Sequence, residues 1–528
     1  WHVYTLHRMD ADGANIRTLS FHETNEWFPT VALSGHVLYS RWDYVDRHPV
    51  LHQNLWACRP DGTNPVALWG NHTQSPHCTF QLQPIPGTSK VVFTASAHHS
   101  ITGGSIAVVD ARLGANGEHA LDRITPDVRF PEAEGKIREY YDAPWPLSED
   151  HFLVGYSPKP LVMEPGANDS AALGIYLLDR WGNRELLYRD PAIGSSNPIP
   201  LVPRHVPPVL PDLTLAKEGV AQPPSAVKET APAQPRAAVP HSSTGEMLLL
   251  DVYEGLDGVP RGTVKALRIV QILPKTTPVA DAPRIGLAGQ EPARALLGTV
   301  PVEADGSARF TLPARKPVYF QALDAEGFAI QSMRSITYAQ PGERTACIGC
   351  HEHRLSAPPG RLVQALRRPP SAIAPGPDGT RPFSYPRLVQ SVLDTHCVRC
   401  HGGEKPAKGL DLTGAPHNGF TRSYWAFCGG LAFWHGGTNP KNAAEALVPR
   451  YGGWNPVHRT EPGGAYGARG SRLMKVLLKR KGDSRLPPED LARLALWIDL
   501  NAVFYGVYDP AAQARQLRGE EVPMPEVQ

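Results

Sequence analysis

Two Cys-x-x-Cys-His segments, at residues 347–351 and 397–401, are the part of this sequence best suited to chemistry. In such a segment the two thiols add across the vinyl groups of a haem, and the His that follows binds the iron from one side. We therefore predict two covalently bound haems of the c type, with the two His residues as proximal ligands of the iron. The residues concerned are Cys347, Cys350 and His351 in the first segment and Cys397, Cys400 and His401 in the second.

A zinc site is the alternative interpretation of these segments, because paired Cys residues with a nearby His can bind zinc tetrahedrally. Two observations favour haem. Both Cys pairs carry His at the same offset, and the chain holds only 7 Cys and 21 His among its 528 residues. Two matches to the full pentapeptide are therefore not expected by chance.

The ligand on the far side of each iron decides what the haem does. A second strong ligand from the protein gives an electron-transfer haem, whereas an open side lets the iron bind and transform a small molecule. For the second haem we place Met474 in the cofactor site, although its apolar helical face also allows it to be a plain core residue. The other candidates are Lys481 and three loop His residues, which are His417, His435 and His458.

A second group of reactive side chains follows the apolar strand that begins at Val37. The group consists of Asp43, Asp46, His48 and His52. Such a group can hold a metal ion, and we predict zinc or calcium bound by Asp43, His48 and His52. Asp43, Asp46 and His52 can also act as catalytic proton donors or acceptors if they reach a substrate. The alternative is a solvated loop with one ordinary Asp–Arg pair.

Polar turns recur along residues 1–203, which carry this second group. The turns at Asp12-Gly13, Asp61-Gly62 and Leu113-Gly114 are separated by 49 and 52 residues. That spacing is close to one four-stranded blade of a β-propeller. Only about three and a half units are visible, so we expect an incomplete propeller, with further blades upstream of residue 1 or on another chain. A β-sandwich built from the same short strands is the alternative.

The remaining sequence divides into four parts. Residues 204–242 are rich in Pro and Ala without periodicity, and we expect an exposed linker. Residues 243–343 contain alternating strands and a hairpin-like turn at Asp305-Gly306, which predict a β-sandwich. Residues 344–382 hold the first haem segment. Residues 383–528 change to helical periodicity and predict a small cytochrome c domain with the second haem.

Local helix signals support this division. Four apolar residues ahead of the second haem segment share one helical face, and they are Leu388, Val389, Val392 and Leu393. Ser471 is expected to cap the helix that carries Met474, and Pro488 is expected to open another helix. We therefore predict a multidomain, mainly β protein, in which a partial β-propeller and a β-sandwich are followed by an α-helical cytochrome c domain.

The composition argues against several classes of partner. The net charge of +2 and the pI near 8.2 give no reason to expect nucleic acid or a membrane surface. No stretch approaches about 18 uninterrupted apolar residues, so we expect no transmembrane segment. Covalent haem attachment takes place outside the cytoplasm, which predicts a periplasmic or extracellular protein. There, Cys58 and Cys78 can pair, and two buried free thiols are the alternative.

Five stretches of the sequence resemble one known family, the hydrazine synthase alpha subunit and its relatives. They are residues 39–47, 298–306 and 319–324, the first haem segment, and residues 496–502. The resemblance covers almost the whole chain except the linker. It implies propeller repeats, a β-sandwich and a C-terminal part with two c-type haems, in that order, with the chemistry at the first haem.

At two places the sequence departs from the pattern of that family. In the hydrazine-forming member a Tyr four residues beyond the first haem segment binds the iron, and the motif His joins propeller Asp and His residues on a zinc ion. Position 355 of this chain is Leu, so His351 is expected to bind iron in the ordinary way. Relatives also tend to carry a Gly-His-His-like segment after the helix of Met474, where this chain has residues 479–483, Lys-Arg-Lys-Gly-Asp.

These observations predict a periplasmic dihaem oxidoreductase that acts on a small, for example nitrogenous, substrate at the first haem and passes electrons through the second. Other redox subunits or cytochromes are the expected partners, within a multi-subunit complex. One alternative is a non-catalytic electron-transfer subunit in which both irons have six ligands. Another is a scaffold in which the propeller binds a partner and haem is structural.

Overall fold

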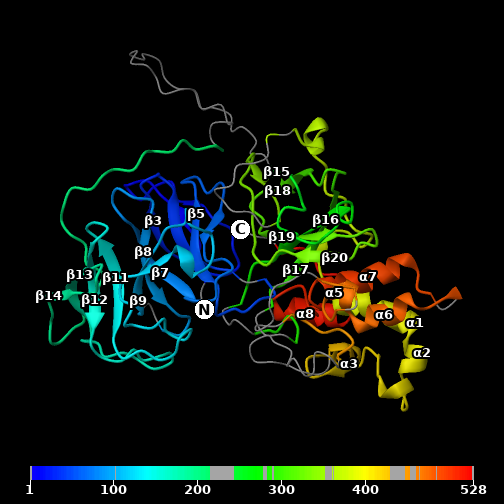
Figure 1. Cartoon of the computed structure of the whole chain (residues 1–528). Helices are drawn as coiled ribbons and strands as arrows, with labels where there is room; N and C mark the ends of the chain where they lie inside the picture. Colours follow the sequence, from blue (N-terminus) through cyan, green and yellow to red (C-terminus); the bar gives the residue numbers. More distant parts are fainter. Residues whose placement is uncertain are drawn as a thin grey trace.

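The structure is a computed structural model in which a few short helices accompany several β-sheets (Figure 1). It describes residues 3–525 apart from residues 44, 101–102, 215–242, 278–281, 288–290, 351–359, 361, 429–445, 452–459, 463 and 483–484. The prediction of a mainly β chain is confirmed. None of the helices in the described part of the chain has the length and apolar character that crossing a membrane requires.

The loop of residues 43–52 connects two strands of the first large sheet. Its hydrogen-bonded order is β10-β9-β8-β7-β5-β4-β3, with β6 paired to β5 off this path, while β1 and β2 form a separate pair. Every residue of β5, and all but the first of β4, is buried, so the loop that joins them leaves a buried strand end. The strands are β1 His7–Arg8, β2 Arg17–Thr18, β3 Glu26–Val31, β4 Val37–Trp42, β5 Gln53–Cys58, β6 Val66–Trp69, β7 Cys78–Pro84, β8 Val91–Ser96, β9 Ser105–Val109 and β10 Leu121–Arg123.

A four-stranded antiparallel sheet follows in the order β11-β12-β13-β14. Its strands are β11 Tyr140–Pro146, β12 His151–Ser157, β13 Gly174–Asp179 and β14 Arg184–Tyr188. Ile106 and Val92 of the first sheet share one buried cluster with Phe152 and Val154 of this sheet, so the two sheets pack face to face. The strand expected to begin at Val37 is present as β4.

Cys58 and Cys78 are buried free thiols rather than a disulfide. β5 and β7 run parallel where they meet, and Gln53 is the residue of β5 that pairs with Cys78. Cys58 therefore lies five residues further along β5, roughly 16 Å away at about 3.3 Å per residue. A disulfide needs Cα atoms closer than about 7 Å, which explains why the two thiols stay apart.

Two further sheets enclose a common core in the middle of the chain. A three-stranded sheet has the order β18-β15-β21 and a five-stranded sheet has the order β20-β19-β16-β17-β22. Met247, Leu267 and Phe310 are among the buried residues that the two sheets share. The strands are β15 Thr244–Leu249, β16 Ala266–Ile272, β17 Arg294–Pro301, β18 Ala308–Pro313, β19 Val318–Leu323, β20 Ala329–Ser332, β21 Arg344–Cys347 and β22 Arg381–Pro382.

The expected hairpin at Asp305-Gly306 is wrong. The turn itself is present, with Gly306 at a φ of +87°, but β17 and β18 on its two sides belong to different sheets. Val300 before the turn and Phe310 after it both point into the core that the two sheets share. Burial of both strands in one core requires them to separate, so the turn passes the chain from one sheet to the other.

The C-terminal third is helical, as its periodicity predicts. The helices are the π-helical turn η4 Pro386–Gln390, α1 Ser391–His396, α2 Val398–His401, α3 Arg422–Cys428, α5 Gly467–Gly470, α6 Arg472–Leu478, α7 Pro488–Asp499 and α8 Pro510–Leu517. Ser471 caps α6 by accepting a hydrogen bond from the Met474 backbone N–H, and Pro488 is the first residue of α7. The four residues predicted to share a helical face, Leu388, Val389, Val392 and Leu393, are all buried.

One hydrophobic core joins the helical part to the five-stranded sheet and to the N-terminal sheets. Trp497 of α7, Val270 of β16 and Val45 belong to the same buried cluster. Val45 also donates a backbone hydrogen bond of 3.1 Å to the Arg334 carbonyl oxygen. The loop of residues 43–52 is therefore packed against the C-terminal half of the chain. In Figure 1 the N-terminal sheets, in blue and cyan, lie on one side, and all later elements lie on the other.

Candidate haem segments and the interface beside them

The first Cys pair is held at the end of strand β21. The Cys347 carbonyl oxygen accepts a hydrogen bond of 3.0 Å from Leu250, and the Cys350 N–H donates one of 2.9 Å to Glu254. Both side chains pack against the core shared by the two middle sheets. Gly349 lies so close to Glu254 that a Cβ atom here would be 2.5 Å from the Glu254 carbonyl oxygen. His351 lies outside the described residues.

The second Cys pair and its His lie on one helical turn. The His401 N–H donates a hydrogen bond of 2.9 Å to the Cys397 carbonyl oxygen, and the Cys397 N–H donates one of 2.8 Å to Leu393. Neither thiol of this pair is in a disulfide, and Cys397 is buried while Cys400 is exposed. His401 Nδ1 is buried and has no hydrogen-bond partner among the described residues. Free thiols and an unengaged imidazole on one turn fit the donor set of a c-type haem.

The distal candidates fall into different surroundings. Met474 is 1% exposed and belongs to the same buried cluster as Cys397, a position that suits either a core residue or an iron ligand. His417 is exposed at the end of β23 Pro416–His417, which pairs with β24 Phe420–Thr421. Lys481 is also exposed. His435 and His458 lie outside the described residues.

Asp43 is buried in a group of charged residues on the N-terminal side. One carboxylate oxygen is 3.7 Å from Arg41 Nε and the other is 3.9 Å from His22 Nε2. Arg47 Nη2 donates a hydrogen bond of 2.7 Å to the Asp43 backbone carbonyl oxygen. Burial raises the pKa of the Asp43 carboxyl, although Arg41 opposes the shift. The alternative of a solvated loop is therefore wrong, because the strand end is covered by the rest of the chain.

Two partners of Asp43 were missed at the sequence level. Glu23 is buried, and neither of its carboxylate oxygens has a hydrogen-bond partner on another described residue. Burial, followed by the charge of Asp43, raises the pKa of Glu23 to about 8, so its carboxyl group keeps a proton at neutral pH. Burial also lowers the pKa of His22 well below its usual range, which leaves the ring neutral. The only sequence signal was an unusually polar run just ahead of β3.

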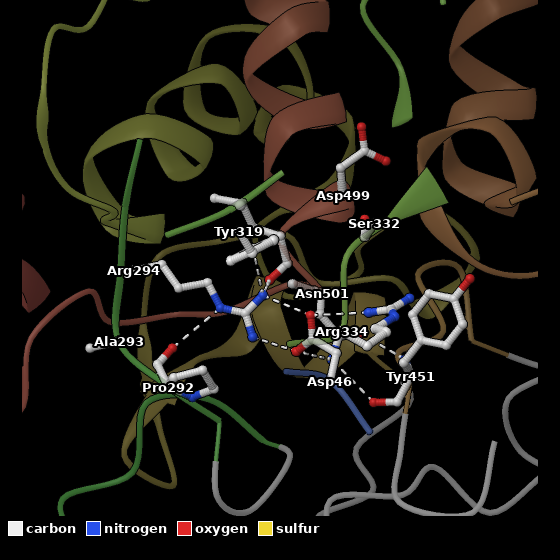
Figure 2. A network of polar contacts seen from close by, with 12 residues as sticks. Asp46, Pro292, Ala293, Arg294, Tyr319, Ser332, Arg334, Tyr451, Asp499 and Asn501 are labelled. Carbon is white, nitrogen blue, oxygen red and sulfur yellow. Dashed lines mark hydrogen bonds and ion pairs between the residues drawn. The ribbon is translucent and has the colours of Figure 1, made fainter. Parts of the chain in front are cut away.

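Asp46 is the centre of a different network, which Figure 2 shows. It accepts hydrogen bonds from Arg294 Nη1 at 2.8 Å, Arg334 Nη1 at 3.3 Å and Asn501 Nδ2 at 3.1 Å. Burial alone would raise the pKa of Asp46, but Arg294 and then Arg334 hold it below the usual value. The carboxylate stays ionised and fully engaged. This arrangement favours a positioning role for Asp46 rather than proton transfer.

His48 and His52 are both buried beside these networks. His48 Nδ1 accepts a hydrogen bond of 3.0 Å from Val50, and His52 Nδ1 is buried without a hydrogen-bond partner in the described part of the chain. Burial, then the charge of Arg47, lowers the pKa of His52 well below its usual range. Among the described residues no group of three or more His, Cys, Asp or Glu side chains is arranged to hold a metal ion. Zinc or calcium at residues 43–52 stays a prediction.

A further imidazole–carboxylate group, also missed from the sequence, lies at the same end of the first sheet. His77 Nδ1 is 3.2 Å from one oxygen of Glu132, and His99 Nδ1 contacts the other. Gln53 at the start of β5 contacts His98 Nδ1 at 2.9 Å. Gln53 and His77 lie at strand starts, His98 and His99 follow the end of β8, and Glu132 lies in the connection between β10 and β11. The N-terminal sheets thus present imidazoles and carboxylates along one edge.

The stretch of chain that leads to the first haem segment contacts the N-terminal part of the protein. Gln340 donates a hydrogen bond of 2.9 Å to the Leu19 carbonyl oxygen, and Glu343 accepts one of 2.8 Å from the Asn64 backbone N–H. Glu343 directly precedes β21, the strand that ends at Cys347. Arg41, the ion-pair partner of Asp43, contacts the Ile336 carbonyl oxygen at 3.4 Å. The Asp43 group and the segment that leads to Cys347 therefore belong to the same interface.

Comparisons with known proteins agree with this architecture. Residues 262–352 match the model of the hydrazine synthase alpha subunit middle domain. The chain is also 22% identical over 525 residues to the hydrazine synthase subunit alpha of Kuenenia stuttgartiensis, an alignment that covers 78% of this chain. The resemblance to the hydrazine synthase alpha subunit family is confirmed. The matched middle domain includes β16 to β21 and the first haem segment.

The match to the family extends to the solved structure of Kuenenia stuttgartiensis hydrazine synthase. The TM-score is 0.66 at 19% sequence identity, over 94% of this chain and 71% of that chain. At this identity the likeness establishes a common fold. The alignment with the curated alpha subunit spans 61% of the length of that protein.

Proposed function

We propose that this chain is a periplasmic or extracellular dihaem c-type oxidoreductase related to the hydrazine synthase alpha subunit. Small-molecule redox chemistry would take place at the first haem and electrons would pass through the second. The observation that carries the proposal is the presence of two Cys pairs, neither of them in a disulfide, on two different supports. Cys347 ends a strand of the middle sheets and Cys350 follows three residues later, whereas Cys397, Cys400 and His401 occupy one helical turn.

The residues that would hold the haems follow from these two supports. Cys347, Cys350 and His351 would hold the first, and Cys397, Cys400 and His401 the second, with Met474 as the distal candidate. A bound haem would supply one-electron exchange at its iron. The separation of the supports suits two roles, because a haem between sheets can be enclosed while a haem beside the exposed Cys400 meets solvent.

The Asp43 group would serve the first haem by holding protons near it. Glu23 keeps its proton at neutral pH, and Asp43 lies in the same buried group with Arg41 beside its carboxylate. Reduction of a small substrate consumes protons, and a buried carboxyl with a raised pKa can deliver one. Asp43 is within the interface that leads to Cys347, which supports this role. His52, with an unengaged Nδ1, is a second candidate to contact the substrate.

We propose that the chain is divided into five parts. We interpret the sheets of residues 1–203 as β-propeller blades, on the basis of the 49- and 52-residue spacing of their turns. The other four parts are the linker at 204–242, the β-sandwich at 243–343, the first haem segment at 344–382 and the cytochrome c domain at 383–528. The name of the curated relative marks it as one subunit, so we propose that this chain also works within a complex.

Carbon monoxide binding tests the proposal directly. One open iron of two should shift about half of the ferrous Soret absorbance, because only a haem with a free side binds the gas. Removal of the second haem by Cys397→Ala with Cys400→Ala should leave the responding half intact. If neither haem responds in the intact chain, small-molecule chemistry at the first haem is rejected.

A non-catalytic electron-transfer subunit is the second candidate function. The observation that favours it is Leu355, which stands where the hydrazine-forming relative would carry the iron-binding Tyr. In that case both irons have six ligands and neither binds carbon monoxide. Metal analysis of the purified holoprotein tests whether zinc or calcium is bound at residues 43–52. A bound ion should be lost in the His48→Ala, His52→Ala variant.

A further inference from the structure

Two stretches beside the second haem segment are rich in basic residues. Residues 397–409 contain Arg399, Lys405 and Lys408 and a single acidic residue, Glu404. Residues 475–481 contain four basic residues and no acidic residue, and they are Lys475, Lys479, Arg480 and Lys481. Seven basic residues against one acidic residue give these two stretches a charge of +6. The whole chain carries only +2, so the rest of it carries −4.

The two stretches form one face of the molecule, which we call the basic face. Arg480, just beyond the end of α6, lies close enough to Cys397 for its charge to oppose the rise that burial causes in the pKa of that thiol. Leu477 of α6 and Leu393 of α1 are in the same buried cluster as Cys397. Figure 1 shows α1, α2 and α6 together at the end of the molecule away from the N-terminal sheets.

The positive charge of this face points outward. Arg399, Lys405, Lys408 and Lys479 are exposed, and so is Cys400, which would carry one thioether of the second haem. An edge of the haem would therefore reach the surface beside these positive charges. The two carboxylates of a bound haem would reduce this excess of charge without reversing it.

From this arrangement we propose that the basic face is the docking surface for an acidic, soluble electron-transfer protein, which exchanges one electron with the second haem. The inference rests on the proposed function, because it requires a haem at Cys397 and Cys400. Opposite charges steer two proteins into productive encounters, and such steering can raise association rates by roughly 10- to 1,000-fold at low salt. In the exchange one electron leaves the metal centre of the donor and reduces one ferric haem iron, and no bond is made or broken.

The test uses the full-length holoprotein and a plant-type [2Fe–2S] ferredoxin, an acidic protein whose low potential makes reduction of a c-type haem favourable. Stopped-flow absorbance gives the rate of haem reduction at increasing salt concentration. The test variant carries Lys405→Gln, Lys408→Gln and Lys479→Gln. The matched control carries Lys136→Gln, Lys159→Gln and Lys265→Gln, three exposed residues on the β-sheet parts of the chain. Both variants lower the net charge equally.

We expect the rate to fall steeply with salt, and the test variant to be slower than the control by at least about fivefold at low salt. Photoreduced lumiflavin, an uncharged reductant, should reduce all three proteins at the same rate, because it needs no docking. Immobilised ferredoxin should retain the wild type and the control to higher salt than the test variant. This second readout does not depend on turnover.

Equal loss of rate in the test and control variants would overturn the docking face, as would a rate independent of salt. Binding to vesicles of phosphatidylglycerol and phosphatidylcholine, with no retention on ferredoxin, would assign the face to a membrane and also overturn the proposal. If the chain carries no haem at the second segment, the haem measurement contradicts the proposed function. If the chain carries both haems and the three lysine substitutions have no effect, only the docking role of the basic face is contradicted.

Discussion

Asp46 and Arg294 are 248 positions apart in the sequence and form a fully buried ion pair. Both terminal nitrogens of Arg294 contact the Asp46 carboxylate, and Arg334 and Asn501 approach the same group. Asp46 comes from the N-terminal sheets, Arg294 begins β17 and Asn501 follows α7. One carboxylate therefore ties the N-terminal sheets, the five-stranded sheet and the helical part into a single body.

Removal of this carboxylate should strongly destabilise the chain. Asp46→Ala leaves Arg294 and Arg334 buried without their counter-charge, so we expect the free energy of unfolding to fall by about 3–5 kcal/mol. Denaturant unfolding followed by tryptophan fluorescence measures the change. Asp169→Ala is the matched control, since Asp169 pairs with Lys159 on the open surface and its loss should leave the transition unchanged. Equal stability of the two variants would contradict the role given to Asp46.

Glu23 should make the chain less stable as the pH rises. Burial raises the pKa of Glu23 from an ordinary value of 4.5 to about 8, so the folded chain holds a proton that the unfolded chain releases. The free energy of unfolding should therefore fall as the pH rises from about 4.5 and level off above about 8, by an amount on the order of a few kcal/mol.

Glu23→Gln should remove that slope, because an amide does not titrate. The measurement is the difference in unfolding free energy between wild type and variant at pH values from about 5 to about 8. Glu520→Gln serves as the control, since Glu520 is exposed and pairs with Arg515 and Arg518 at the surface. A wild type and a Glu23→Gln variant that differ by the same amount at every pH would refute the buried proton.

Gly349→Ala should disturb the first haem without affecting the second. A Cβ atom at this position would lie 2.5 Å from the Glu254 carbonyl oxygen, so the backbone between Cys347 and Cys350 would have to move. We expect a lower haem content at the first segment, measured by mass spectrometry of the haem-bearing peptides. Gly360→Ala is the control, because no atom lies within 4 Å of the Cβ position there. Full haem occupancy in Gly349→Ala would show that this close contact does not matter.

Met474→Leu separates the two roles that its burial allows. Leu has a similar volume, so the free energy of unfolding should change by less than about 1.5 kcal/mol in either case. If Met474 binds the second iron, as we predict, the variant should turn one haem from low to high spin in its EPR spectrum and allow that haem to bind carbon monoxide. An unchanged spectrum would assign Met474 to the hydrophobic core alone.

Asp43→Asn tests the catalytic role proposed for the Asp43 group. The amide keeps the size of the side chain, so the haem content should stay the same. Because the amide is not basic, turnover of a small nitrogenous substrate should fall by about 10²-fold or more. The assay can use hydroxylamine as the substrate and a reduced viologen as the electron donor. Asp122→Asn is a suitable control, because Asp122 is exposed and pairs with Arg180 on the surface of the N-terminal sheets. Equal turnover of Asp43→Asn and wild type would remove Asp43 from the catalytic residues.

Local signals in the sequence predicted local features correctly. The shared face of Leu388, Val389, Val392 and Leu393 predicted the helical turns ahead of Cys397. Ser471 and Pro488 marked the starts of α6 and α7. Strand positions followed from runs of apolar residues. Each of these depends on neighbours within a few positions, which the sequence displays directly.

Features decided by distant partners escaped prediction. The sequence showed Asp46 as one of four similar side chains, and nothing in it named Arg294 as the partner. Glu23 looked like an ordinary charged residue until the fold buried it beside Asp43. The turn at Asp305-Gly306 was correct, but the core shared by two sheets decided that its strands would not pair.

We predict that the chain binds two haems covalently, one at Cys347 with Cys350 and one at Cys397 with Cys400. The decisive measurement is the number of haems per chain that remain after acid–acetone extraction, with their positions identified by peptide mass spectrometry. Thioether bonds survive this treatment, so two haems should remain in the wild type and one in the Cys397→Ala, Cys400→Ala variant. A chain that retains no haem and instead contains zinc bound by these cysteines would contradict covalent haem binding.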